Sequence, residues 1–392
     1  MTRILCFADL HLKYGSPYDR EPGDRLEDQV KVGQRIVEIA RERECSLILN
    51  AGDTYEGPIV QPEEYAAYAR SIGEWHGEIL AVLGNGRHDS AKRSVTAPEV
   101  IDKANTITTP CVAQAANCAI ACLPWCPVDR LVATRGGGER ADINREAAAH
   151  LISIAQDLRA ECSEKFPDLP AILLAHWSVE GGVTATGVEA INFAEPIIPR
   201  ADIEAMDWSA SFFGHVHAAQ ELLTVMGGPI VIPGSPLPLS FGEPGEHGVW
   251  IFDTETGAAE FVPIESRPLV TVEIPLDQFP DDDPWTLLAE YGDDAPDITD
   301  AIVKVRYTAT AEQAKRIDHR KLRDALYEAG AHKVFAIEPI VERETRARVE
   351  GVTETLGEME ALDAYIEAQV IDAKTAGAMR KRTSRYLSEV GA

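Results

Sequence analysis

The stretch Ser211-Phe212-Phe213-Gly214-His215-Val216-His217 has the pattern of a short apolar strand that ends in two imidazoles. Residues two apart in an extended chain point to the same side, so His215 and His217 form a natural pair for holding a metal ion. Two histidines cannot hold an ion alone, and an isolated His-x-His is more often a solvated turn. The meaning of this pair therefore depends on what the other strands supply.

Four other apolar runs also end in residues that can bind metal. The five predicted strand ends carry Asp9 and His11, Asp53, Asn85 and His88, His176, and His215 and His217. Helical periodicity over residues 24–43 and 62–75 separates the first three runs, and this alternation predicts an α/β fold with a parallel or mixed sheet. Ligands of such sheets bind at the carboxyl ends of strands. Oxygen and nitrogen ligands in this number suit two divalent ions about 3.5–4 Å apart.

Length and charge limit the alternatives. The chain has 392 residues, of which 45% are hydrophobic, so we expect one large α/β unit with an appendage. The formal net charge of −27 argues against a generally basic, DNA-coating surface. It does not exclude nucleic acid, because a metal-centred site attracts phosphate locally.

The seven cysteines are read as reduced thiols. Cys118, Cys122 and Cys126 lie four residues apart, but there is no Cys-x-x-Cys pair and no nearby histidine. Core thiols are therefore favoured over a zinc site, and a cytoplasmic protein is expected. No apolar run approaches the ~18 residues of a membrane-spanning helix, so no membrane association is expected.

The pattern changes after Arg267-Pro268. Three predicted strands and one helix form a small α+β module over residues 267–345, after a catalytic domain over residues 1–266. Residues 346–392 form a tail of two predicted helices. The apolar stripe of the first tail helix consists of Leu356, Met359, Leu362, Ile366 and Val370. Such a stripe on a terminal helix pair predicts a docking surface.

The strand-end motifs resemble those of the calcineurin-like metallophosphoesterases. They are Asp9-x-His11, Gly52-Asp53, Gly84-Asn85 with His88-Asp89, His176, and Gly214-His215-x-His217, which span residues 1–245. The chain is more narrowly similar to SbcD-type nuclease subunits of double-strand-break complexes. That similarity includes His176-Trp177-Ser178-Val179, Pro233-Gly234-Ser235-Pro236-Leu237 and Ser240-Phe241-Gly242-Glu243. It implies a metallophosphoesterase-type β-sandwich flanked by helices, with a capping module and a helical tail.

The resemblance also implies roles for individual residues. Asp9, His11 and His217 would hold one ion, and Asn85, His176 and His215 would hold the other, with Asp53 bridging both. Mixed oxygen and imidazole ligands favour Mn²⁺ and leave Mg²⁺, Fe²⁺ and Zn²⁺ open. His88, oriented by Asp89, would stand beside the phosphate and protonate or stabilise the leaving oxygen.

One departure from the family pattern affects this assignment. The family has Asn and His adjacent, whereas Gly86-Arg87 lies between Asn85 and His88 here. In one interpretation Gly86 takes a positive φ, the loop bulges, and Arg87 points at the substrate phosphate. In the other, His88 is displaced, Arg87 substitutes for it electrostatically, and hydrolysis is slow or absent.

The implied activity is cleavage of DNA phosphodiesters. An SbcC-like SMC-type ATPase would bind the tail helices, and a homodimer is implied. Four basic residues of the module, Arg316, Arg320, Lys321 and Arg323, are candidate DNA contacts, although such a run is usually a solvated helix face. Two rival hypotheses are a stand-alone metallophosphoesterase acting on small phosphoesters and a non-catalytic scaffold subunit that binds DNA ends.

Overall fold

We describe a computed structural model of the chain, which covers residues 2–89, 104–132, 139–183, 195–243, 245–275, 296–341 and 357–390. The chain divides into two compact units. The first unit contains Met1–Glu273, Leu288–Arg306 and Asp318–Glu338, and the second contains Ile274–Leu287, Tyr307–Ile317 and Pro339–Ala392. The domain boundaries that we expect near residues 266 and 345 stay predictions.

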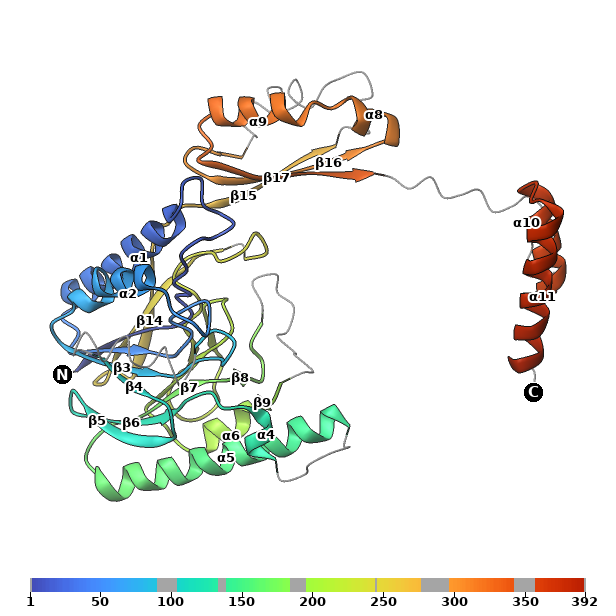
Figure 1. Cartoon of the computed structure of the whole chain (residues 1–392). Helices are drawn as coiled ribbons and strands as arrows, with labels where there is room; N and C mark the ends of the chain where they lie inside the picture. The colour runs from blue at the N-terminus through green and yellow to red at the C-terminus, as the bar shows by residue number, and fades with distance from the viewer. Residues whose placement is uncertain are drawn as a thin grey trace. The chain divides into compact units, whose positions relative to one another are not determined.

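Two six-stranded sheets form a β-sandwich in the first unit (Figure 1). The first sheet has the strand order β14 (Ala258–Pro263), β13 (Gly248–Asp253), β1 (Arg3–Phe7), β2 (Leu47–Asn50), β3 (Glu78–Val82) and β4 (Ala104–Ile107). The second has the order β11 (Gln220–Leu222), β12 (Ile230–Ile232), β10 (Ala210–Gly214), β7 (Ala171–His176), β6 (Cys118–Leu123) and β5 (Cys111–Ala115).

The inner faces of the two sheets share one apolar core. Ile4 and Leu49 of the first sheet belong to the same buried cluster as Ile172 and Phe212 of the second. Neighbouring strands β1, β2 and β3 run parallel, as do β7 and β10. Their carboxyl ends therefore lie at one edge of each sheet. The predicted ligands stand at or directly after these strand ends.

Helices cover the outer faces of both sheets (Figure 1). The first sheet packs against α1 (Asp24–Glu42), α2 (Pro62–Ala69) and the 3₁₀ turn η1 (Ile72–Glu74). The second packs against α4 (Val128–Leu131), α5 (Arg140–Lys165) and α6 (Arg200–Ala205). A two-stranded sheet joins β8 (Ser178–Val179) to β9 (Ile197–Ile198). This arrangement confirms the predicted β-sandwich flanked by helices.

Two local predictions need correction. Asp24 stands at the start of the periodic run over residues 24–43, which makes it a plausible N-cap, but it does not cap α1, because the cap position is Gly23, which has a positive φ of 93°. The helix expected over residues 62–75 ends at Ala69, and a 3₁₀ turn follows.

The remaining strands and helices follow residue 266. A three-stranded sheet has the order β15 (Leu269–Pro275), β16 (Ile302–Ala309) and β17 (Lys333–Val341). The helix predicted over residues 319–329 is present as α9 (His319–Glu328), and a short helix that was not predicted, α8 (Ala311–Arg316), precedes it. The N-cap residue of the short α8 is Thr310, whose hydroxyl accepts a hydrogen bond from the Gln313 N–H in a capping box.

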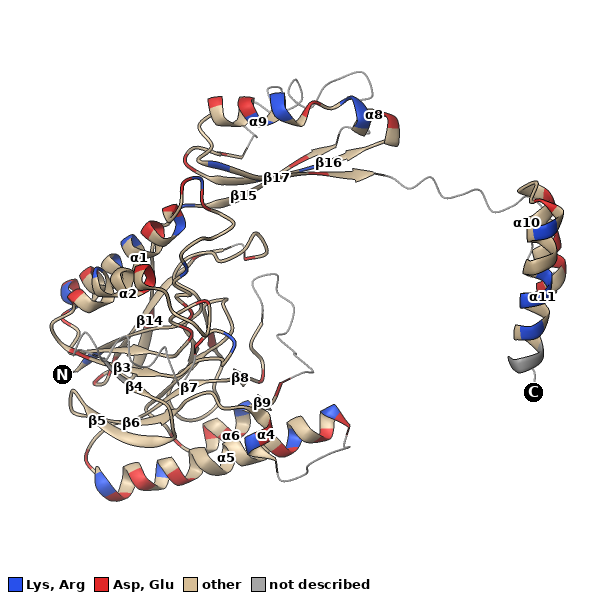
Figure 2. Ribbon diagram, in the orientation of Figure 1, with Lys and Arg blue, Asp and Glu red and all other residues tan. Residues whose placement is uncertain are grey.

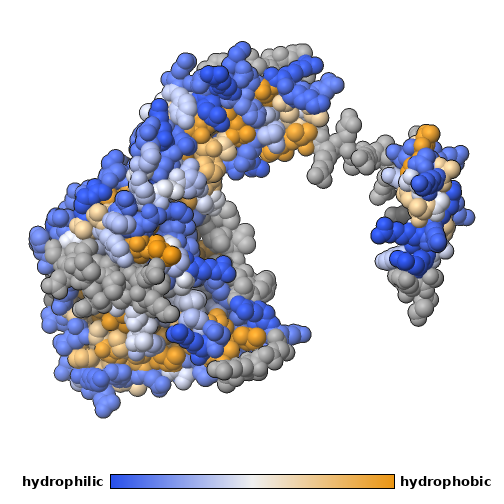
Figure 3. Space-filling model, in the orientation of Figure 1, coloured by the Kyte–Doolittle hydropathy of each residue, from blue (hydrophilic) through white to orange (hydrophobic). Residues whose placement is uncertain are grey.

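The tail forms the predicted helix pair, α10 (Glu358–Ala368) and α11 (Ala373–Val390). Ile366 is buried between the helices, whereas Tyr365 and Tyr386 are 40% and 63% exposed, and apolar residues appear among hydrophilic ones on the face in Figure 3. Val370 does not belong to the stripe, because it lies beyond the end of α10 with a positive φ of 50°. Leu356 lies outside the described residues.

Within the described part of the chain, none of the helices combines the length and apolar character that crossing a bilayer requires.

Candidate metal centre

Four of the predicted ligands have a backbone conformation that residues with side chains rarely adopt. The φ angles are 53° for Asp9, 47° for His11, 50° for Asp53 and 99° for His215. Left-handed conformations at residues other than glycine are costly and concentrate at functional sites. The backbone of these loops is therefore bent in a way that positions particular side chains.

Glycines precede several of these ligands because the loops pass close to one another. A Cβ on Gly84 would collide with the side chain and backbone of Asp53. A Cβ on Gly214 would collide with the carbonyl oxygen of Ala51. The Gly-Asn and Gly-His motifs thus allow the ends of β3, β2 and β10 to approach each other directly.

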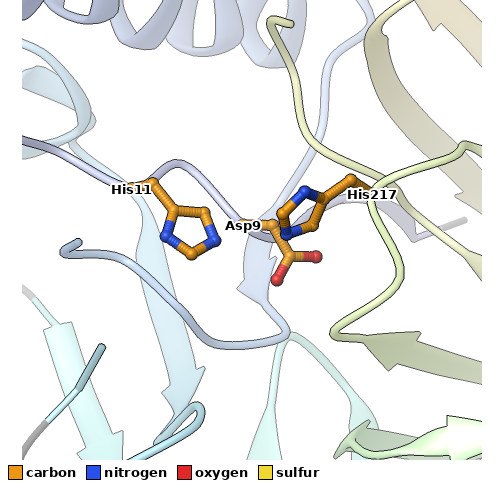
Figure 4. Close-up of side chains that lie close together, drawn as sticks. All are labelled: Asp9, His11 and His217. Carbon is orange, nitrogen blue, oxygen red and sulfur yellow. The ribbon is translucent and has the colours of Figure 1, made fainter. Parts of the chain in front are cut away.

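Asp9, His11 and His217 form a first cluster of potential ligands. One ligand atom from each lies within 4.8 Å of the others, and Figure 4 shows the three side chains converging. The carboxylate of Asp9 is fully buried and accepts the backbone N–H of His215 at 3.1 Å. The loop after β1 and the loop after β10 are thereby held together at this cluster.

Asp53 connects two further clusters. One contains His11, Asp53 and His88, and the other contains Asp53, His176 and His215, each within 4.8 Å. Asp53 Oδ2 lies 3.8 Å from His11 Nε2 and 3.4 Å from His176 Nε2. Burial alone would raise the pKa of Asp53, but the neighbouring histidines, His176 foremost, hold it below its usual value. Asp53 is therefore ionised and central, which is the arrangement expected of a bridging ligand.

His176 provides a test of whether a metal ion fits. Its Nδ1–H donates to the Ala51 carbonyl at 2.7 Å, which leaves Nε2 as the free ligand atom. That nitrogen is buried and has no hydrogen-bond partner among the described residues. Burial disfavours the charged ring, but Asp53 and Asp9 raise the pKa of His176 to about 9. A buried imidazole nitrogen without a hydrogen-bond partner and a neighbouring carboxylate are ligands that a divalent cation would bind. The residues present at this site therefore fit a metal ion.

Asn85 and His88 remain together despite the Gly86-Arg87 insertion. The backbone N–H groups of His88 and Asp89 both donate to the Asn85 carbonyl at 2.8 Å, so the insertion forms one helical turn. The expectation of a positive φ at Gly86 is wrong. This position excludes a side chain for another reason, because a Cβ there would lie 2.8 Å from the Trp125 ring.

The other members of this turn are placed as follows. The Asn85 N–H donates to Asp53 Oδ1 at 2.6 Å, and the Asn85 side-chain oxygen accepts the Arg87 N–H at 3.0 Å. The remaining lone pair of that oxygen is available to an ion. Arg87 is exposed. The pKa of Glu195 is lowered, first by the hydrogen bond with His215 and to a smaller extent by the charge of Arg87.

The expected orientation of His88 by Asp89 is wrong. Asp89 is 4% exposed and accepts backbone N–H groups from Gly84 at 3.0 Å and Tyr55 at 3.2 Å, so it ties two loops together. Burial and then the charge of Asp53 raise the pKa of Asp89 to about 6. His88 instead donates its Nδ1–H to the carbonyl oxygen of Glu56 at 3.0 Å.

Three glutamates that the sequence analysis assigns no role in the metal centre contact the histidines. The carboxylate of Glu56 lies 2.8 Å from His11 Nδ1, and that of Glu195 lies 2.7 Å from His215 Nε2. Glu243 lies 3.1 Å from His217 Nδ1. Burial would lower the pKa of His217, but Glu243 and Asp9 raise it to about 9.

The basic residues proposed as DNA contacts are exposed. Arg316 ends α8, and Arg320, Lys321 and Arg323 lie on α9, where Figure 2 shows basic segments in blue. No described contact joins them to the metal cluster. Their role in binding DNA, like the ligand roles of the clustered residues, stays a prediction.

Comparison with known proteins gives distant structural likenesses. No family model matches the sequence, and no curated protein matches it. The protein TT1561 of Thermus thermophilus is 13% identical, with 67% of this chain and 99% of that chain covered and a TM-score of 0.41. An archaeal phosphodiesterase is 11% identical, with 67% and 100% covered and a TM-score of 0.33. A dimetal phosphatase from Danio rerio is 11% identical, with 64% and 91% covered and a TM-score of 0.39. At these values the likenesses assign neither a family nor a function to this chain.

Proposed function

We propose that this chain is a two-metal phosphoesterase that hydrolyses phosphodiester bonds. One observation supports the proposal most directly: potential metal ligands from separate strand ends lie close together around the ionised carboxylate of Asp53. Asp53 lies 3.8 Å from His11 Nε2 and 3.4 Å from His176 Nε2, and both histidines belong to clusters that include it. Two divalent ions bound there would polarise the phosphoryl oxygens and activate water as a nucleophile.

His88 is suited to the proton transfer that such a reaction needs. Its side chain is 30% exposed, whereas that of His11 is 3% exposed, so a substrate can reach His88. Its Nδ1–H is held by the Glu56 carbonyl, which leaves the other ring nitrogen free to hold a proton at the leaving oxygen. Arg87 adds an exposed cation on the same turn, which can attract a phosphate.

Hydrolysis of bis(4-nitrophenyl) phosphate in the presence of Mn²⁺ tests this proposal. We expect His88→Ala to lower kcat by about 10²–10⁴-fold without loss of bound metal. Arg87→Ala should mainly raise KM, because the guanidinium contributes to substrate binding. Full activity of His88→Ala would overturn its assignment, and loss of activity in Arg87→Ala alone would favour electrostatic substitution by Arg87.

We further propose DNA as the substrate and Mn²⁺ as the native metal. The motif similarity to SbcD-type nuclease subunits supports both proposals, as do the exposed basic residues on α9. Metal-dependent cleavage of linear, hairpin and single-stranded DNA, with and without an SbcC-type ATPase, is the direct measurement. Arg320→Glu with Arg323→Glu should weaken DNA binding and reduce its salt dependence. An unchanged salt slope would remove α9 as a DNA contact.

The tail helices are our proposed docking site for the ATPase. An ion pair between Arg380 and Asp363, 2.6 Å long, joins α11 to α10, while Tyr365 and Tyr386 leave apolar surface exposed. Deletion of residues 350–392 should spare hydrolysis of small phosphodiesters and abolish co-purification with the ATPase. Retained co-purification would place the docking site elsewhere. A homodimer stays a proposal, which sedimentation of the purified chain tests.

The two rival functions predict different results in the same assays. A stand-alone phosphoesterase would cleave small esters and never DNA, with or without the ATPase. A scaffold subunit would bind two metal ions and DNA ends without turnover of any substrate.

A further inference from the structure

Two cysteines lie directly opposite each other on neighbouring strands that carry none of the proposed metal ligands. Strands β5 and β6 are antiparallel, and their register pairs Cys111 with Cys122. Opposed residues in antiparallel strands have Cα atoms about 4.5–5.5 Å apart. Disulfides span Cα separations of about 4.4–6.8 Å. The backbone positions of the two cysteines therefore already satisfy the main distance requirement of a disulfide.

Both thiols are on the same face of the sheet. Cys122 is fully buried in the core cluster between the two sheets, and Cys111 packs against that cluster. The register is fixed by a two-residue turn, in which Ala116 and Asn117 have positive φ angles of 45° and 60°. Such angles define the type I′ turn that joins tightly twisted hairpins. The two side chains are thus held next to each other rather than meeting by chance.

The two thiols differ in the way that a reactive cysteine and its resolving partner differ. Cys111 lies on the edge strand and is partly exposed, whereas Cys122 is buried. The hydrogen bond from Cys122 outweighs burial and lowers the pKa of Cys111 to about 7, while the pKa of Cys122 is raised. Thiolate content and access together determine which cysteine an oxidant attacks.

We propose that Cys111 and Cys122 form a thiol-oxidation site that reacts with hydroperoxides and closes to a reversible disulfide across the β5–β6 hairpin. The Cys111 thiolate attacks one peroxide oxygen, the O–O bond breaks, and protonation yields a sulfenic acid and an alcohol or water. The Cys122 sulfur then attacks the Cys111 sulfur, and the Cys122 proton leaves with the hydroxyl group as water. Two thiols and one hydroperoxide thus give one disulfide, water and the reduced peroxide.

Alkylation of the full-length protein tests the first step. With iodoacetamide at pH 7.5, Cys111 should react more than about tenfold faster than Cys126. Cys126 is the matched control, because it is also partly exposed and burial raises its pKa to about 11. The rate at Cys111 should rise with pH through about 7, where its thiolate forms, and then level off. Equal rates at the two cysteines would overturn the assignment of Cys111 as the reactive thiol.

Hydrogen peroxide followed by peptide mapping tests the disulfide. The oxidised protein should be lighter by two hydrogen atoms, contain a linked Cys111–Cys122 peptide, and return to its original mass with dithiothreitol. Cys111→Ser should abolish this change, and Cys122→Ser, whose hydroxyl can still donate a hydrogen bond to Cys111, should leave a sulfenic acid that dimedone traps at Cys111. Cys126→Ser should behave as wild type. A link from Cys122 to Cys162, a link between two chains, or no link would each overturn the proposal.

Discussion

The carboxylate of Glu243 lies 3.1 Å from Nδ1 of His217 and is itself held in place. It accepts hydrogen bonds from the backbone N–H of Leu239 at 2.8 Å and from the hydroxyl of Ser240 at 3.2 Å. An imidazole that donates one N–H to a fixed carboxylate presents its other nitrogen in one orientation. Glu243 therefore directs His217 towards Asp9 and His11.

The first prediction concerns this contact. Glu243→Gln should lower the affinity for Mn²⁺ by roughly 10–100-fold, because the ring of His217 loses its orienting charge. Isothermal titration calorimetry on the purified protein measures the change without an enzyme assay. Glu246→Gln is the matched control, since Glu246 is an exposed acid in the same loop. Equal affinities for both variants and the wild type would rule out a positioning role for Glu243.

The second prediction concerns the packing of Gly86 against Trp125. Trp125 cannot easily move away, because it stacks on Trp177 with an interplanar angle of 17°, and Trp177 is 3% exposed. Gly86→Ala should therefore shift the turn that carries His88 and lower phosphodiester hydrolysis by about tenfold or more.

A control and a rescue belong to this experiment. Gly57→Ala should be neutral, since a Cβ at Gly57 meets no atom within 4 Å. Adding Trp125→Phe to Gly86→Ala should restore part of the activity by making room for the new methyl group. Wild-type kinetics for Gly86→Ala alone would contradict the packing argument.

The ligand set is predictable from sequence because its signals are local. Each of Asp9, Asp53, His176 and His215 follows an apolar run, and the run itself specifies the strand that carries the residue to the common edge. Parallel pairing of neighbouring strands then brings the residues together without any further information.

The supporting residues are harder to predict because their partners are distant in sequence. Glu56, Glu195 and Glu243 are three among 64 acidic residues, and neither composition nor hydrophobic periodicity distinguishes a carboxylate that faces a histidine from a solvated one. Glu56 follows Asp53 by three positions, which is a usable signal, and Glu243 ends a stretch that resembles a family motif. The role of Gly86 depends on Trp125, a contact that only the folded chain creates.

The third prediction concerns buried charge at the N-terminal half of α1. Asp28 is 5% exposed and lies 3.5 Å from the guanidinium of Arg25, which is 3% exposed, and 2.8 Å from that of Arg267. Asp28→Asn would leave the buried Arg25 without a carboxylate and Arg267 with only the exposed Asp300, and should lower the free energy of unfolding by about 3 kcal/mol. A lower urea midpoint measures this loss. The neighbouring Glu27→Gln, which breaks an exposed pair with Arg70, should cost less than about 1 kcal/mol. Equal losses of stability in the two variants would show that burial of an ion pair does not determine how strongly its removal destabilises the protein.

The fourth prediction concerns removal of metal. An ion that binds the folded chain stabilises it by about 2.7 kcal/mol at one hundred times its dissociation constant, so EDTA should lower the thermal midpoint of the wild type. Asp53→Asn keeps an oxygen that can accept the N–H of Asn85 but removes the charge shared by the clusters. Its midpoint should be the same with Mn²⁺ and with EDTA. Asp168→Asn, at an exposed acid, should respond to Mn²⁺ as the wild type does. A Mn²⁺-dependent shift in Asp53→Asn equal to that of the wild type would mean that the stabilising ion does not depend on the carboxylate that the two Asp53 clusters share.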